Sequence, residues 1–304
     1  MTARPRVSVV MPIYNGRRFV ADAVASVRAS HFTDLELLII DDGSTDGSAD
    51  EATRAAGRDR RVHVLTLPRG GVAAARNVGL HRARGEFIAN LDADDLMLPE
   101  RLDRQVAYLD RHPECVAVGS RALIVDGDGN PLRVGGRVYT HEAIDEAHLD
   151  GRPGAILNPT ATFRRQAALS IGGYAGHLKS TGEDHDLWLR LAEVGRLANL
   201  PEVLVRYRVH GANVSVGPGA ADRRRATTLA TLQRAHERRG LADRRAEPRD
   251  HPPIRTWERW CDAALVHYFS GRRRRAVIRG FAAWLLQPHS PATRSALRTV
   301  ASLG

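Results

Sequence analysis

The sequence predicts an α/β fold: a doubly wound, mainly parallel sheet with helices on both faces. Two observations support this class. Apolar runs of strand length alternate with segments of helical period over the first hundred residues, and polar clusters follow the apolar runs. The carboxyl ends of parallel strands meet at one edge of a sheet, where ligands bind. We therefore expect the polar clusters to converge on one site.

The first strands are expected at continuous apolar runs, which are typical of parallel strands covered on both faces. Helices are expected where apolar residues recur at helical spacing, as they do from Phe19 to Val27. The predicted strands cover residues 7–11, 35–40, 62–67 and 86–91, and the predicted helices cover 17–29, 48–56 and 72–84.

Beyond these elements the pattern is less regular. Pro99 suits the first turn of a helix that ends before Pro113. A strand is expected over 115–125, and the segment Asp126–Asn130 then favours a hairpin turn. The same segment resembles the start of a calcium loop, but Arg137 stands where the twelfth position requires Glu, so we assign it no function. The further expected elements are a strand and turn over 155–175, a helix over 183–194 and an extended segment over 200–210.

Charge is distributed unevenly along the chain. Residues 1–219 hold 27 Lys+Arg against 28 Asp+Glu, whereas residues 220–304 hold 18 against 7. A Gly- and Ala-rich stretch, 211–221, separates the two parts and is typical of a boundary. The composition after the boundary is mostly helical, so we expect a basic helical extension.

Several protein classes are disfavoured. No apolar run approaches the roughly 18 residues that span a bilayer, and the N-terminus lacks a small-residue cleavage site, so a cytoplasmic protein is expected. Cys115 and Cys261 lie far apart and fit neither a disulfide scaffold nor a metal cluster. No G-x-G-x-x-G follows the first strand and no P-loop is present, which argues against dinucleotide oxidoreductases and P-loop enzymes.

Three carboxylates, Asp92, Asp94 and Asp95, follow the strand expected over 86–91. Carboxylates this close repel one another unless a cation offsets them, and oxygen ligands favour Mg or Mn over Zn. The alternative is a solvated turn before an acidic helix start. The motif alone leaves both interpretations open.

Two further clusters also have a structural and a functional interpretation. Residues 41–46 could accept hydrogen bonds from the N–H groups of a base or from the hydroxyls of a ribose. They could equally cap the next helix. Glu183 and Asp184 open a helix, where the helix dipole favours acidic residues, but a carboxylate facing a cleft could also remove a proton from a hydroxyl. His210 taken alone is interpreted as a surface or core histidine.

In their order along the chain, these residues resemble glycosyltransferase family 2, whose members have the GT-A fold. The resemblance covers residues 7 to 215 and rests on the ordered set of motifs. The matching segments are VSVVMPIYNG (7–16), DDGSTDGS (41–48), GVAAARNVGL (71–80), GEFIANLDADD (85–95), NPTATFRR (158–165), IGGY (171–174), TGEDHDLWLRL (181–191) and YRVHGANVS (207–215). It implies a GT-A glycosyltransferase domain over 1–219, followed by the extension over 220–304.

The resemblance implies a donor site for a nucleotide-sugar, with a UDP-sugar as the first expectation. Asp42 is expected to accept the N–H of the base, and Arg76 to add a contact on the nucleotide side. Asp92 is expected to contact the ribose or to make a contact mediated by water. The other residues that the resemblance assigns to the donor are Pro12, Tyr14, Gly172 and Gly173.

The resemblance also implies an inverting, metal-assisted transfer. Asp94 is the expected direct ligand of a Mn or Mg ion that bridges the diphosphate, with Asp92 as its partner in the motif and His210 completing the coordination. Asp184 is the expected catalytic base, and Glu183 forms the acidic pair with it.

The expected acceptor is a glycan or lipid-linked glycan in cell-surface polysaccharide synthesis. A QxxRW motif and membrane-spanning helices are typical of processive synthases and are missing from the sequence, so we expect a single addition.

The extension leaves two interpretations open. Its arginine runs, 223–225 and 272–275, and its aromatic residues suit an anionic membrane surface, which would place the protein peripherally at the inner face of the membrane. Alternatively, it is a helical cap whose tryptophans pack on the catalytic domain.

Three other functions are weighed against the glycosyltransferase. A nucleic-acid-binding protein would use the same arginines on phosphates, but no recognised module supports it and no nucleic-acid partner is expected. A nucleotidyltransferase would need a glycine-rich N-terminal signature that the sequence lacks. A catalytically inactive protein that binds nucleotide-sugars is the third alternative.

Overall fold

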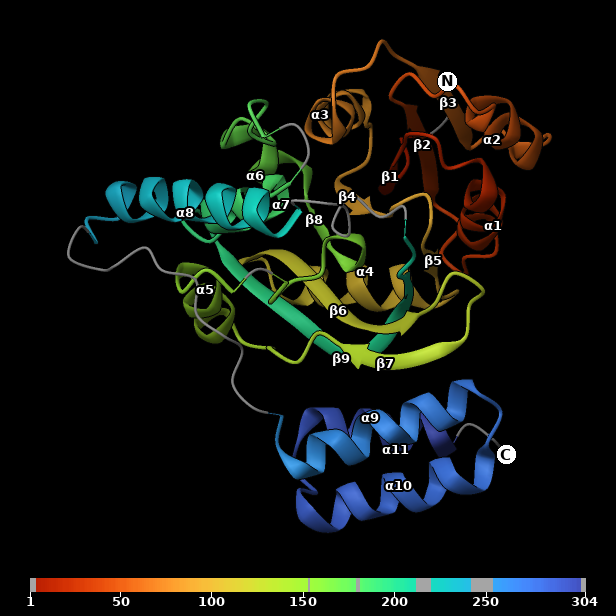
Figure 1. Cartoon of the computed structure of the whole chain (residues 1–304), viewed down its shortest axis with the longest axis vertical. Coiled ribbons are helices and arrows are strands. Elements are labelled where there is room, and N and C mark those ends of the chain that lie inside the picture. Colours follow the sequence, from red (N-terminus) through yellow and green to blue (C-terminus); the bar gives the residue numbers. More distant parts are fainter. Residues whose placement is uncertain (1–3, 153, 179–180, 212–219, 242–253, 302–304) are drawn as a thin grey trace.

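The computed structural model describes residues 4–301 apart from 153, 179–180, 212–219 and 242–253. Nine strands of this described part form one sheet in the order β3-β2-β1-β4-β8-β6-β9-β5, with β7 paired to β6 (Figure 1). The first four neighbours run parallel to one another: β3 (Val62–Thr66), β2 (Leu35–Asp41), β1 (Val7–Ile13) and β4 (Phe87–Asn90).

The other half of the sheet is mixed. β8 (Thr162–Arg164) runs antiparallel to both β4 and β6 (Cys115–Val125), whereas β6 and β9 (Arg196–Arg208) are parallel. β5 (Leu96–Met97) pairs antiparallel with β9, and β7 (Pro131–Gly135) pairs antiparallel with β6. The predicted α/β class is confirmed, and the parallel arrangement is concentrated in the first half.

Helices cover both faces because side chains alternate along each strand. On one face, Val9 of β1 packs in a core with Val20 of α1 (Arg17–Arg28), and α2 (Ser48–Ala56) and α4 (Arg101–Arg111) cover the same side. On the other face, Val10 packs in a core with Leu80 of α3 (Val72–Arg82) and Trp188 of α7 (Glu183–Leu191). α3 approaches β1 closely because Gly79 carries no Cβ to meet Val10.

The expected hairpin is confirmed, because Asp126 accepts hydrogen bonds from the backbone and side chain of Asn130 between β6 and β7. The helix expected over 183–194 ends earlier, at Leu191. Sequence periodicity did not reveal four short elements: β5, the 3₁₀ helix Asn158–Thr160, α5 (His141–Leu149) and α6 (Arg165–Ser170).

The helices that follow β9 form two groups. α8 (Ala220–Arg238) packs on α5 and α7. α9 (Thr256–Phe269), α10 (Arg273–Leu286) and α11 (Pro291–Ala301) lie together next to β7 (Figure 1). The predicted boundary at 211–221 falls mostly outside the described residues. None of the helices in the described part combines the length and apolar character that a membrane span requires.

The second helical group is fixed to the sheet by charge and by apolar contact. Asp262 of α9 accepts hydrogen bonds from Arg121 of β6 and from Arg137, which follows β7. Trp257 and Trp260 pack on an apolar cluster that includes residues of β6, β7 and β9. Trp257 and Trp260 therefore pack as expected for a helical cap on the sheet.

Candidate active site

The carboxyl ends of β1, β2 and β4 open into a cavity of about 1660 Å³. Segments far apart in the sequence contribute to it, and its lining includes both Asp94 and Asp184. The predicted site residues in the lining are Pro12, Tyr14, Asp42, Arg76, Asp92, Asp94, Glu183, Asp184 and His210.

The turn after β1 is tied to the loop after β2. Asn15 has φ 51, in the left-handed region that asparagine tolerates better than most residues. Its side-chain oxygen accepts a 2.9 Å hydrogen bond from the Thr45 N–H, and its own N–H donates to the Ser44 hydroxyl over 3.0 Å. The Gly16 N–H donates to the Ser48 hydroxyl. Part of the polar motif that starts at Asp41 therefore shapes the backbone of the site.

Asp42 organises the loop that leads into α3. Its buried carboxylate accepts hydrogen bonds from the backbone N–H groups of Gly70, at 2.7 Å, and Gly71, at 2.9 Å. The guanidinium group of Arg69 lies over the ring of Tyr14 and 3.5 Å from Asp42. The sequence analysis missed Arg69, although its position directly after the third strand is a signal that could have identified it.

Asp94 and His210 meet although they lie 116 residues apart in the sequence. His210 Nε2 lies 3.0 Å from Asp94 Oδ2, and the imidazole packs against the ring of Phe19 with 4.6 Å between centroids. Burial and the neighbouring charge of Asp92 raise the pKa of Asp94. A cation at this carboxylate would offset that unfavourable environment.

These residues fit a divalent ion that is shared with a substrate. Within the described residues, no group of three or more His, Cys, Asp or Glu side chains forms a complete metal site. Mg²⁺ and similar ions, however, commonly use one or two protein ligands together with substrate phosphates. The carboxylate of Asp94 and the imidazole of His210 would provide one oxygen and one nitrogen ligand for such an ion.

The third carboxylate of the cluster, Asp95, is buried and has a structural role. It accepts a 2.7 Å hydrogen bond from the backbone N–H of Arg208 in β9. Burial, followed by the charges of Asp94 and Asp92, raises its pKa well above the usual value. The cluster therefore divides: Asp94 faces His210, Asp95 faces β9, and Asp92 faces Arg76.

Arg76 joins two of the predicted acidic motifs. It is buried, and it donates to Asp92 over 2.7 Å and to Glu183 with its other terminal nitrogen. Burial opposes its charge, but the two carboxylates outweigh that effect and raise its pKa. The structure thus places Arg76 behind the carboxylates as their common partner, at the edge of the cavity.

Glu183 and Asp184 are neighbours in different environments at the start of α7. Glu183 is buried, and burial raises its pKa to about 7 against the opposing effect of Arg76. Asp184 is partly exposed in the cavity, and its Oδ1 accepts a 2.8 Å hydrogen bond from the His185 N–H. Asp184 is therefore the carboxylate of the pair that a substrate can reach.

Gly172 and Gly173 are not among the residues that line the cavity, and their contact with the donor stays a prediction. They end α6, with φ values of 82 and 70, and the Gly173 N–H donates to the Ala168 carbonyl over 2.8 Å. The turn brings Tyr174 to Asn77, which exchanges two hydrogen bonds with the Tyr174 backbone. The two glycines therefore form a turn beside the site.

The cavity extends away from the donor motifs toward the C-terminal helices. Its lining there includes Arg133 of β7, Arg137, Arg224 of α8, and Arg255 and Glu258 at the start of α9. The sequence analysis assigned no role to these positions. They belong to no recognisable motif, and only the fold brings them to the cavity.

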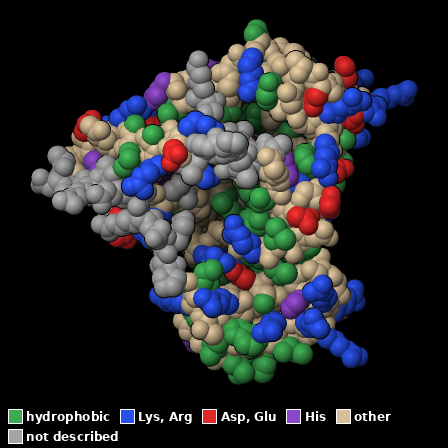
Figure 2. Space-filling model, viewed as in Figure 1, with side chains coloured by type: hydrophobic (Ala, Val, Ile, Leu, Met, Phe, Trp, Pro, Cys, Tyr) green, Lys and Arg blue, Asp and Glu red, His purple; other side chains and the backbone are tan. Residues whose placement is uncertain are grey.

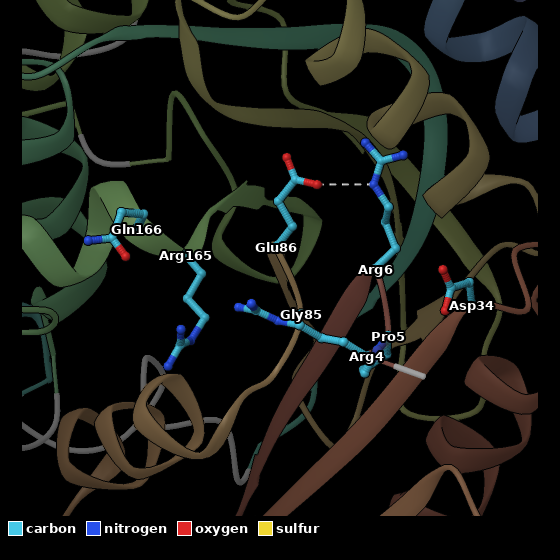
Figure 3. A pocket seen from close by; sticks show the side chains of 8 residues that line it. All are labelled: Arg4, Pro5, Arg6, Asp34, Gly85, Glu86, Arg165 and Gln166. Atoms are coloured by element: carbon cyan, nitrogen blue, oxygen red, sulfur yellow. Dashed lines mark hydrogen bonds and ion pairs between the residues drawn. The ribbon is translucent and has the colours of Figure 1, made fainter. Parts of the chain in front are cut away.

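A second hollow, of about 370 Å³, lies at the opposite edge of the sheet (Figure 3). It is lined by residues just before β1, β2 and β4, such as Arg6 and Glu86, which share a 3.1 Å hydrogen bond. Arg6 also donates to Asp110. The amino ends of the strands face this hollow, whereas the predicted site residues follow the carboxyl ends. None of the predicted site residues therefore lines it.

Comparisons with known proteins agree with the fold and the motifs. The model of the family described as "Glycosyl transferase family 2" matches residues 8–171. The putative glycosyltransferase EpsE of Bacillus subtilis is 34% identical over 212 residues, which are 68% of this chain and 74% of EpsE. The putative teichuronic acid biosynthesis glycosyltransferase TuaG of the same organism is 29% identical over 236 residues, 77% of this chain and 90% of TuaG.

Solved structures show the same fold at low sequence identity. S. aureus TarS 1–349, in complex with UDP-GlcNAc, is 17% identical with a TM-score of 0.59, and the match covers 98% of this chain and 91% of that chain. The mannosyltransferase PcManGT from Pyrobaculum calidifontis, in complex with GDP-Man and Mn²⁺, is 19% identical with a TM-score of 0.57, covering 100% of this chain and 77% of that chain.

Proposed function

This chain belongs to glycosyltransferase family 2 and is a glycosyltransferase, and from that premise we propose that it transfers a sugar from a nucleoside-diphosphate donor to an acceptor hydroxyl with inversion at the anomeric carbon. The observation that carries the proposal is the single cavity whose lining includes both Asp94 and Asp184. One carboxylate suits a cation on the donor, and the other suits a proton acceptor beside it.

The donor nucleotide binds at the ends of β1 and β2. Tyr14 and Arg69 form one wall against which a base can stack, and Asp42 is held rigidly by the loop at Gly70. Asp42 Oδ1 accepts from both Gly70 and Gly71, whereas Oδ2 accepts from Gly71 and has a second lone pair with which it could accept the base N–H. UDP is the first candidate nucleotide, and the UDP-GlcNAc bound to TarS gives one precedent among proteins of this fold.

Asp94 and His210 are the residues that would hold a Mn or Mg ion, and Asp92 lies beside them. Such an ion, when bound, would stabilise the negative charge of the departing diphosphate. Arg76 fixes the direction of Asp92 through their 2.7 Å hydrogen bond. The Mn²⁺ bound to PcManGT together with GDP-Man supports this assignment for the fold.

Asp184 acts as the base. The acceptor oxygen forms its bond to the anomeric carbon from the face opposite the diphosphate, while the bond from that carbon to the phosphate oxygen breaks and its electron pair leaves with the diphosphate. The acceptor proton passes to Asp184. A positioned base of this kind contributes about 10²–10⁴ in rate. Glu183 positions the start of α7 through Arg76.

The acceptor is a hydroxyl of a glycan or a lipid-linked glycan, added once per reaction in the synthesis of a cell-surface polysaccharide. The similarity to TuaG, a putative teichuronic acid biosynthesis glycosyltransferase, supports this class. We assign the transfer to a GT-A domain over 1–219 in a cytoplasmic protein, with residues 220–304 as its helical extension.

A thermal-shift panel of nucleoside diphosphates and sugar nucleotides, run with and without Mn²⁺, tests the proposed donor site. We expect one base to raise the melting temperature, and chelation of the metal to reduce that shift. Asp94→Asn should lose the metal-dependent part, whereas the control Asp128→Asn, in the exposed hairpin, should keep it. No response to any nucleotide would contradict the proposal, and donor binding without transfer would indicate an inactive nucleotide-sugar-binding protein.

A further inference from the structure

The helix α10 presents its large apolar side chains outward. Ala276, Gly280 and Ala283 are the buried residues of this helix. A Cβ at Gly280 would lie 3.3 Å from Leu297 of α11 and 3.9 Å from Ala264 of α9, so the small residues mark the contact with both neighbours. Surface helices of globular proteins usually show the reverse, with the large apolar residues toward the core.

The outward face of α10 is a continuous apolar surface. Its exposed side chains recur at helical spacing, and the rings of Phe281 and Trp284 stack with 5.6 Å between centroids. Figure 2 shows hydrophobic side chains gathered over this lower end of the molecule, with arginine or lysine side chains beside them. The exposed large residues are Val277, Ile278, Phe281, Trp284, Leu285 and Leu286.

The charge around this face has one sign. From Ala263 to Gly304 the chain contains seven arginines and no Asp or Glu. Five of them, Arg272 to Arg275 and Arg279, lie just before or within α10. Their effect extends to α9, because burial and then the guanidinium groups of Arg272, Arg275 and Arg279 lower the pKa of His267.

The apolar face of α10 and the arginines around it favour one kind of binding partner over another. A second copy of the chain, docked face to face by a two-fold axis, would bring the arginines of one copy against those of the other, with no carboxylate in α10 or α11 to pair them. An anionic bilayer offers both an apolar interior and negative headgroups. Basic residues beside exposed aromatic and aliphatic residues are the pattern of helices that lie in the membrane interface.

We propose that the exposed face of α10 docks this protein peripherally on an anionic lipid bilayer. The helix lies along the surface, its apolar side chains enter the headgroup region to a depth of about 5–10 Å, and its arginines contact lipid phosphates. α10 packs on α9, and Arg255 and Glu258 at the start of α9 line the cavity. The cavity thus borders the helical group that carries the docked face, which suits an acceptor carried by a lipid. Docking itself does not depend on transfer.

Co-sedimentation of the full chain with vesicles tests the proposal. The vesicles contain phosphatidylcholine alone or phosphatidylcholine with phosphatidylglycerol, at low and high salt. We expect binding to the anionic vesicles, at least tenfold weaker binding to the neutral ones, and a further decrease at high salt. Absence of binding to anionic vesicles at low salt would overturn the proposal.

Two pairs of variants separate the apolar contribution from the charge. I278Q/L285Q changes side chains that are 64% and 63% exposed, and its control, L132Q/V194Q, changes side chains elsewhere that are 55% and 50% exposed. R274Q/R275Q changes two exposed arginines of α10, and its control, R58Q/R60Q, changes two exposed arginines beyond α2. Each α10 variant should weaken binding to anionic vesicles about tenfold or more, and the controls should bind as the wild type does.

Trp284 provides a direct readout of insertion. Lipids that carry a nitroxide in the upper acyl chain should quench part of the tryptophan fluorescence, and W284F should remove that quenched part. The variants should keep their thermal shift with the nucleoside diphosphate, which separates a failure of docking from a failure of the donor site. A different result would contradict the proposal: the wild type does not bind vesicles but forms a dimer in light scattering, and I278Q/L285Q abolishes that dimer. The face of α10 would then be an interface between copies of the chain.

Discussion

Arg76 connects the acidic residues of the two halves of the site. It donates to Asp92, after β4, and to Glu183, at the start of α7. Both carboxylates are otherwise partly or fully removed from water, where an unpaired charge is costly. This shared partner explains how two acidic motifs can lie close together. The pKa of the neighbouring Asp94 is raised by burial and by the charge of Asp92.

Glu183 gives a pH dependence that can be measured. Its pKa in the folded protein is about 7, raised by burial from the usual 4.5. Between those values the folded state binds more protons than the unfolded state, so the contribution of Glu183 to stability falls as pH rises from about 5 to 7. Glu183→Gln removes the titrating group. Denaturant unfolding of both proteins should show a pH-dependent difference in the free energy of unfolding over this window.

A matched control for that measurement is Glu142→Gln, because Glu142 is exposed and paired with Arg196 at the surface. Its unfolding free energy should follow the wild-type pH profile within error between pH 5 and 7. If Glu183→Gln and wild type also have parallel profiles, Glu183 does not titrate with a raised pKa in the folded protein.

Candidate site residues could be predicted from the sequence where a motif contained them. Asp94, His210 and Asp184 were all predicted, and all line the cavity. The local sequence could not show that Asp95, next to Asp94, turns toward β9, because that depends on a strand that occurs more than a hundred residues later. The sequence also did not show that the turn at Gly172 and Gly173 leads into the hydrogen bonds between Tyr174 and Asn77.

At the scale of elements, the helical group α9–α11 depends on a buried ionic contact. Asp262 of α9 accepts hydrogen bonds from Arg121, which is fully buried in β6, and from Arg137. Removal of one partner of a buried pair leaves an uncompensated charge, which costs about 3–5 kcal/mol. Asp262→Ala should therefore lower the free energy of unfolding by this amount in denaturant titrations.

Two comparisons sharpen that prediction. Glu142→Ala removes an exposed ion pair and should cost at most about 1 kcal/mol. Asp262→Leu combined with Arg121→Met removes the charges of the more buried of the two pairs and should recover part of the loss. A cost for Asp262→Ala no larger than that for Glu142→Ala would show that α9 is fixed to the sheet by apolar contacts instead.

Elements were predictable where the periodicity was long. The apolar runs at β1, β2 and β6 and the helical spacing of α1 match the structure closely because their faces are fully covered. α6 has a single buried residue, and β5 has only two residues, so neither carries enough pattern to be recognised. In α10 the hydrophobic pattern is present, but the sequence alone does not show that it faces outward.

At the scale of the whole molecule, the strand order creates the site. β4 lies beside β1, and β9 crosses the second half of the sheet beside β6, so that His210, just after β9, returns to Asp94. The α/β class followed from the alternation of strands and helices, but the mixed half of the sheet did not, because no local pattern specifies the antiparallel position of β8. The resemblance to family 2 implied that Asp94 and His210 come together, but it did not predict this pairing of β8.

The most direct test of the account compares Asp184→Asn and Asp94→Ala in two assays: calorimetric binding of the nucleoside diphosphate with Mn²⁺, and transfer to acceptor. Asp184→Asn should bind the nucleotide as the wild type does and lose at least 10²-fold in turnover, because the base is gone. Asp94→Ala should lose the metal-dependent part of nucleotide affinity. Normal turnover by Asp184→Asn, or metal-dependent binding by Asp94→Ala equal to that of the wild type, would contradict the assignment of these two carboxylates to one catalytic cavity.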